Sequence, residues 1–125
     1  MTKSVQLYTL ETTNHQPIVL RELSTRIPLA CKQPEVPLTP LEGTGTITTA
    51  SGKQKAIVVL DTQTLKPQLE SNGNTYDLIV DAEWQRLQQH MLRCWLNLLK
   101  ARQANGTASH QKEIEAARQA LKNAS

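Results

Sequence analysis

The stretch from Asp81 to Gln103 constrains the fold more than any other part of this chain, because it is the longest segment with an unambiguous periodicity. Apolar residues recur along it at intervals of three and four, as they do in an amphipathic helix. Asp81 offers a side-chain oxygen to the free amides of the first turn, and Glu83 complements the helix dipole. The Asn105-Gly106 pair suits the left-handed conformation that ends helices. One long helix is therefore predicted here.

The apolar face of this helix is wide. It spans an arc of roughly 160° or more, whereas about 100° suffices for a helix that packs on one side only. A fully buried Leu or Met contributes about 1.5–3 kcal/mol, so leaving several exposed would consume much of a typical stability of about 5–15 kcal/mol. We therefore predict that a protein partner or a second copy of the chain covers part of the arc. Packing by the rest of the chain is the alternative. The residues predicted to form this interface are Trp84, Leu92, Trp95, Leu96 and Leu99.

The opposite side of the helix carries a basic row, which suggests a second hypothesis. Residues 1–80 contain seven Lys/Arg and seven Asp/Glu, and residues 81–125 contain seven and four, so the net charge of +3 arises entirely in the second part. Such a row can neutralise phosphates, although a solvated helix face has the same composition and no aromatic residue is interleaved for base stacking. The predicted nucleic-acid contacts are Arg86, His90, Arg93 and Lys100.

Residues 1–80 predict a β module of about six short strands. Three hairpins are expected, pairing Val5–Leu10 with Pro17–Leu23, Thr44–Thr49 with Lys55–Leu60, and Leu65–Glu70 with Thr75–Val80.

Three details refine the predicted sheet. Asn72-Gly73 is the strongest turn signal, because a type I′ turn needs positive φ at both central residues. The run from Ala56 to Leu60 is apolar at every position, which indicates a central strand covered on both faces, with the long helix on one of them. Pro67 suits an edge strand because it cannot donate to a ladder.

Two further segments complete the predicted organisation. Prolines spaced by three between Lys32 and Glu42 indicate an extended surface connector. A shorter helix is expected from about His110 to Lys122, with Ser109 as its cap. We predict one α+β domain over residues 1–125, consistent with its length. It is a small antiparallel β-sheet or barrel of about six strands (1–80), followed by one long amphipathic helix and a shorter C-terminal helix (81–125).

No local pattern indicates catalysis, a cofactor or a metal site. The three histidines, His15, His90 and His110, are not spaced as metal ligands are. Cys31 and Cys94 lie far apart in the sequence, so they are expected to be free thiols. A catalytic or small-ligand site would need a pocket that gathers His15 or His90 with carboxylates. We expect no enzyme activity and no cofactor. Neither a signal peptide nor a membrane-spanning run is present, so we expect a cytoplasmic protein with no membrane association.

Two functions follow as expectations. The first is a non-catalytic protein-interaction or assembly module that uses the Trp-containing amphipathic helix to bind a protein partner or to form a homo-oligomer. The alternative is a nucleic-acid-binding small β-barrel with a basic helix face. An open sheet face with exposed Tyr8 or Tyr76 favours the alternative, because aromatic rings stack on bases. A sheet covered by the helix favours the first.

Overall fold

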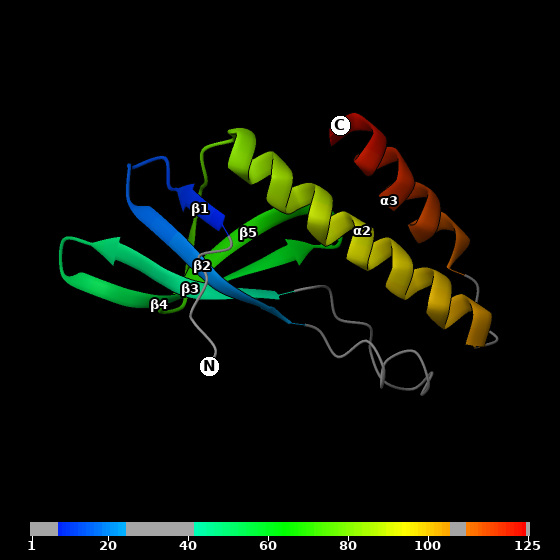
Figure 1. Cartoon of the computed structure of the whole chain (residues 1–125), viewed down its shortest axis with the longest axis horizontal. Helices are drawn as coiled ribbons and strands as arrows, with labels where there is room; N and C mark the ends of the chain where they lie inside the picture. Colours follow the sequence, from blue (N-terminus) through cyan, green and yellow to red (C-terminus); the bar gives the residue numbers. More distant parts are fainter. Residues whose placement is uncertain (1–7, 25–41, 106–109, 125) are drawn as a thin grey trace, which may run out of the picture.

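The computed structural model describes residues 8–24, 42–105 and 110–124, and it confirms the predicted α+β class (Figure 1). Six antiparallel strands form a curled half-barrel sheet, which a long helix and a shorter C-terminal helix follow. The predicted proline connector, Cys31 and the caps at Gly106 and Ser109 lie outside the described residues. The elements are β1 (Tyr8–Glu11), β2 (Pro17–Ser24), β3 (Glu42–Thr49), β4 (Gly52–Asp61), β5 (Lys66–Ser71), β6 (Asn74–Tyr76), α2 (Ala82–Asn105) and α3 (Gln111–Ala124).

The sheet is a simple meander in which each strand pairs with the next in the chain, in the order β1-β2-β3-β4-β5-β6. The three predicted hairpins are present as β1–β2, β3–β4 and β5–β6. The last strand was predicted to reach Val80 but ends at Tyr76, and residues 5–7 of the first predicted strand lie outside the described residues. The turn of the last hairpin has φ of 51° at Asn72 and 77° at Gly73, which is the predicted pair of positive values.

The two ends of the sheet meet at one point, which we call the seam. An isolated antiparallel bridge joins Thr12, just after β1, to Leu78, just after β6. Two backbone hydrogen bonds hold it: the Thr13 N–H donates to the Asp77 carbonyl at 3.0 Å, and the Ile79 N–H donates to the Glu11 carbonyl at 2.8 Å. The sheet is therefore closed at the seam and curled elsewhere, which gives the half-barrel.

Strand β4 is central, as predicted, but only one of its faces is covered. Its burial alternates: Ala56, Val58 and Leu60 are fully buried, whereas Ile57 and Val59 are only half-buried. The prediction that both faces are covered is wrong. Two half-buried β-branched residues on the outer face made an alternating strand look continuously apolar in sequence.

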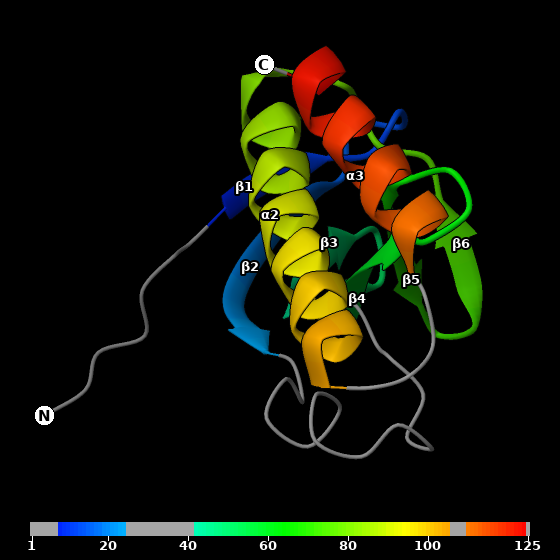
Figure 2. The same cartoon turned by 90° about the vertical axis from the view of Figure 1, so that its right-hand side faces the viewer.

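Helix α2 lies across the concave face of the sheet, and α3 runs back alongside it in the opposite direction (Figures 1 and 2). Asp81 caps α2 as predicted, since its Oδ1 accepts a hydrogen bond from the Trp84 N–H at 2.9 Å. Ile114 and Ala117 of α3 join a single core cluster with the sheet and α2. Among the described residues, neither helix combines the length and the hydropathy that a bilayer crossing needs.

Candidate interaction site at the seam of the sheet

The wide apolar arc of α2 is buried inside the chain itself. The exposed fraction of the five predicted interface residues is 7% for Trp84, 0% for Leu92, 5% for Trp95, 8% for Leu96 and 0% for Leu99. The sheet covers one side of the arc and α3 covers the other. Helix α3 buries Ile114 and Ala117 and packs Ala120 and Leu121 against the same cluster, so it supplies the cover that we assigned to a partner. The width of the arc is thus explained by intramolecular packing, the alternative left open above.

The predicted basic row is divided between two environments. The Arg86 guanidinium lies 4.0 Å from the centre of the Tyr8 ring, and its Nε donates to Glu83 at 2.7 Å. His90 is half-buried, with its Nδ1 2.9 Å from the Tyr8 hydroxyl. Arg93 and Lys100 are exposed on the same helix. Arg86 is exposed as well, but Glu83 and Tyr8 hold its guanidinium, so it is solvated and engaged at the same time.

Tyr8 joins β1 to α2 and has no open ring face. It is 5% exposed, and burial raises the pKa of its hydroxyl, with Arg86 acting in the opposite direction. Glu83 completes the contact: Arg86 lowers the pKa of its carboxyl, and this carboxylate also accepts a hydrogen bond from the Thr9 backbone N–H. The cluster therefore fixes the edge of β1 to the first turns of α2, and Tyr8 is not available for base stacking. Tyr76, the other predicted candidate, is half-buried.

The three histidines lie in separate parts of the described chain. His15 contacts Glu11 at 3.0 Å on an exposed turn, and His110 contacts Glu113 at 3.0 Å at the start of α3. Within residues 8–24, 42–105 and 110–124, no group of three or more His, Cys, Asp or Glu side chains is arranged to hold a metal ion. Cys94 is a half-buried free thiol, and burial raises its pKa.

The seam is where the chain leaving β6 exchanges one neighbouring strand for another. Its pairing with β5 ends at Tyr76, which lies opposite Leu69, and its hydrogen bonds to the β1 side begin at Asp77. Strand β5 is consequently unpaired on this side from Lys66 to Gln68. We call the opening between this stretch and residues 77–80 the slot.

Counting from the turn explains why the pairing stops. In a two-residue hairpin the flanking residues, here Ser71 and Asn74, form a hydrogen-bonded pair, and every second pair beyond them does the same. A continued ladder would place Pro67 opposite Leu78 in such a pair. Because Pro67 has no N–H, that pair would lack one of its two hydrogen bonds. The missing donor removes one of the reasons for the strand to stay with β5 at this position.

The edge-strand prediction for Pro67 needs a correction. Strand β5 lies inside the sheet, between β4 and β6, so it is not an edge strand as a whole. The departure of β6 makes its first half a local edge, and the nitrogen of Pro67 faces that open side.

The slot presents unpaired backbone groups. Because the Asp77 carbonyl and the Ile79 N–H bond toward β1, the N–H and carbonyl of Leu78 point the other way, toward β5. In the described part of the chain, no hydrogen bond reaches either group of Leu78. The Pro67 carbonyl points into the slot by the same alternation. One main-chain donor and two acceptors therefore face a single opening.

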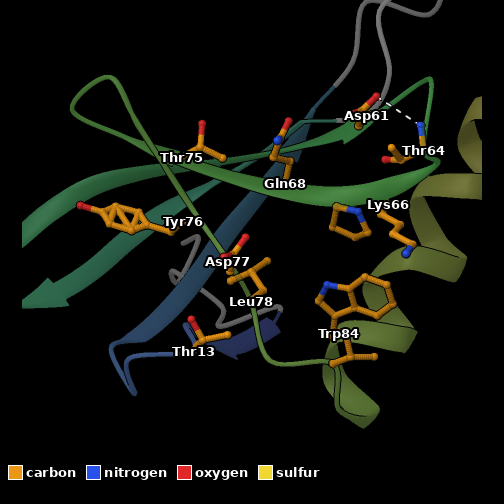
Figure 3. Close-up of a pocket in the computed structure, with 12 residues that line it drawn as sticks. Thr13, Asp61, Thr64, Lys66, Gln68, Thr75, Tyr76, Asp77, Leu78 and Trp84 are labelled. Carbon is orange, nitrogen blue, oxygen red and sulfur yellow. Dashed lines mark hydrogen bonds between the residues drawn. The ribbon is translucent and has the colours of Figure 1, made fainter.

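The slot encloses about 450 Å³ and has an apolar wall. Figure 3 shows the Trp84 indole reaching from α2 toward β5, with Lys66 and Leu78 near it. Val80 stands at the same rim and is 61% exposed, which makes it the one exposed large hydrophobic side chain of the described residues. Asp61 and Asp77 add carboxylates to the lining.

The β4–β5 turn is held so that it presents Lys66 and Pro67 to the slot. Leu65 adopts a left-handed φ of 60°, which a branched side chain disfavours. Its N–H donates to the Asp61 carbonyl at 2.6 Å, and its carbonyl accepts a hydrogen bond from Gln88 Nε2 of α2 at 3.0 Å. These two hydrogen bonds tie the turn to α2, so the start of β5 is held next to the helix that carries Trp84.

Sequence reasoning identified part of this site. It singled out Trp84 and Pro67, but it gave them separate roles and it missed Leu78 and Val80. The signal was present: residues that lie at equal distances from the Asn72-Gly73 turn face each other, and that count puts Pro67 opposite Leu78.

Comparisons of this chain with models of protein families, with curated proteins and with solved structures found no match.

Proposed function

We propose that this protein is a non-catalytic protein-interaction module whose partner binds at the slot. The supporting observation is the exposure of Val80 beside the Trp84 indole, at the rim of a recess that also holds unpaired backbone groups. A single exposed apolar side chain is common on protein surfaces. Here, however, it adjoins an aromatic wall and unsatisfied hydrogen-bonding groups, and this combination favours a surface that a partner covers.

The proposed surface differs from the predicted one. Of the five residues predicted on α2, Trp84 lines the slot, while Leu92 and Leu99 are fully buried. In this proposal Trp84 contacts the partner, as expected from the sequence. The contact is made by the edge of its indole in the slot and not by an exposed face of α2.

Affinity capture with the full chain tests this proposal. The bait is compared with Val80→Glu, which puts a charge on the apolar rim, and with the control Thr48→Glu, which puts the same charge on an exposed position of β3. A partner should be retained by the wild type and the control and lost by Val80→Glu, and titration of the purified pair should reproduce that order. Equal retention by all three baits contradicts the proposed surface.

A second candidate is nucleic-acid binding through the exposed Arg93 and Lys100 of α2. The supporting observation is that both side chains are exposed on the part of the chain that carries the whole positive excess. Affinity for single-stranded or duplex nucleic acid should then fall steeply with salt and should weaken when both become Ala. Absence of binding at low salt in a fluorescence anisotropy titration would remove this candidate.

A further inference from the structure

We infer that the slot binds a partner segment in extended conformation, which adds a strand between β5 and Leu78. This inference rests on the proposed function and names the chemistry of its partner. The backbone of the segment hydrogen-bonds to Leu78 on one side and to the Pro67 carbonyl on the other. One of its apolar side chains packs against Trp84 and Val80.

The backbone groups of the slot carry the inference. An extended chain offers an N–H and a carbonyl at every second residue along each of its edges. Leu78 offers one donor and one acceptor from an extended segment that is already bonded to β1 on its far side. Pro67 offers an acceptor from a strand that is already paired with β4 on its far side. An inserted strand would therefore complete two ladders that stop at the same place, which is the principle of strand addition to an open edge.

The lining of the slot defines the side chains of the partner. Trp84 and Val80 form an apolar wall, while Asp61, Asp77 and Lys66 contribute two carboxylates and one ammonium group. Neighbouring side chains of a strand point to opposite faces. We therefore expect an apolar residue toward Trp84 with Lys or Arg at adjacent positions.

The partner is a segment of another protein and not the other described edge of a second copy. The outward edge of β1 is already covered by Glu83 and by the chain after β6, because the Thr9 N–H donates to Glu83, the Glu11 carbonyl accepts from the Ile79 N–H, and the Thr13 N–H donates to Asp77. Self-association through the slot is one of the outcomes that the following experiment separates.

Selection from a displayed library of random heptapeptides provides the test. The library is selected on the full chain and depleted on the variant Pro67→Val, in which a restored N–H lets β6 continue along β5 and close the slot. Selected peptides should alternate apolar and basic residues. A synthetic selected peptide should shift the Leu78 and Trp84 backbone amide resonances of the labelled chain and slow hydrogen exchange of the Leu78 amide at least tenfold at saturation.

An N-methylated copy of the same peptide is the sharpest control. Methylation of the peptide nitrogen that faces Pro67 removes one donor and leaves every side chain in place, so affinity should fall at least tenfold. Val80→Glu should weaken binding at least tenfold as well, and Thr48→Glu should leave it unchanged. Val80→Glu, an exposed substitution, keeps the test valid if Pro67→Val does not fold.

Three outcomes would overturn the inference: no peptide that distinguishes the wild type from both slot variants, equal affinity of the N-methylated peptide, or sedimentation showing a dimer that Val80→Glu dissociates. The affinity capture described above separates these failures from failure of the proposed function. A protein partner that is lost by Val80→Glu while no peptide binds leaves an interaction module without strand addition. Absence of both removes the module and the strand together.

Discussion

The two strand edges that meet at the seam are treated in opposite ways. On the β1 side, three outward groups have partners: the Thr9 N–H bonds to the Glu83 carboxylate, and the Glu11 carbonyl and the Thr13 N–H bond to the chain after β6. On β5, the stretch from Lys66 to Gln68 has no strand paired with it on the β6 side, although the Pro67 side chain is buried. Exposed edges are a hazard that proteins usually cover or interrupt.

The difference coincides with the position of one proline, Pro67, in β5. The segment after β6 has hydrogen-bonding groups on both of its sides and lies between β1 and β5. On the β1 side it makes a single bridge, between Leu78 and Thr12, with one hydrogen bond from the Thr13 N–H and one to the Glu11 carbonyl. Its pairing with β5 stops after Tyr76, and the next hydrogen-bonded pair would be the one in which Pro67 lacks a donor. The open edge is therefore local, and we expect it to depend on Pro67, which the substitution below tests.

Both edges depend on α2, so the largest expected effect comes from loosening that helix. Leu87 is fully buried one turn after Trp84, and Leu87→Ala should lower the free energy of unfolding by about 2–5 kcal/mol. Urea denaturation followed by circular dichroism measures it. Val80→Ala is the matched control and should change stability by less than about 0.5 kcal/mol, because Val80 is largely exposed. Similar losses for the two variants would contradict the distinction between the core face of α2 and the slot.

Much of this architecture followed from local patterns in the sequence. The turn at Asn72-Gly73 set the register of the last hairpin, and Asp81 marked the start of α2, because both signals depend only on neighbouring residues. The neighbours of a surface are not encoded locally. The apolar arc of α2 is wide enough to contact two neighbours. The periodicity indicated this width but did not reveal that α3 is the second neighbour.

The candidate site was less predictable for the same reason. Arg86 and His90 have the spacing of a solvated basic row, and only the fold brings Tyr8 from the other end of the described chain to lie between them. The slot combines residues from β5, from the chain after β6 and from α2. Its open edge lies where Pro67 and Leu78 do not form a backbone pair, and the sequence does not show directly that a pair is missing.

The substitution Pro67→Val should have the second largest effect: it should close the open edge of β5. The new N–H faces the Leu78 carbonyl, so β6 can pair with β5 and β1 at once. We expect about 0.5–1.5 kcal/mol from each added hydrogen bond, opposed by about 0.4–1 kcal/mol because the unfolded chain loses the rigidity of proline. The decisive measurement is hydrogen exchange of the Leu78 amide, which should slow at least tenfold. Unchanged exchange in a folded variant would show that Pro67 does not cause the separation.

Val80→Glu should separate binding from stability at the open edge. Because Val80 is 61% exposed, the free energy of unfolding should change by no more than about 0.5 kcal/mol, while partner binding should be lost. Thermal unfolding and a binding titration on the same sample measure the two quantities. A stability loss of several kcal/mol would show that the rim belongs to the core.

Glu83→Gln tests the closed edge and should give the smallest effect. Arg86 and the Thr9 N–H stabilise the charged form of this carboxylate, which lowers its pKa in the folded protein below that of the unfolded chain. A lowered folded-state pKa contributes stability above the unfolded pKa, and that stability is lost as pH falls through the folded pKa. The wild type should therefore be slightly more stable than Glu83→Gln at pH 7, and the difference should shrink at acid pH as the Glu83 carboxylate is protonated in the folded protein. Salt should reduce the difference as well, because Glu83 and Arg86 are exposed to solvent. Urea midpoints at the two pH values measure this, and Glu22→Gln, which removes a carboxylate from an exposed site on β2, controls for the change in net charge. If the Glu83→Gln difference persists at low pH, its cause is the geometry of the first turn of α2 and not the charge that closes the edge of β1.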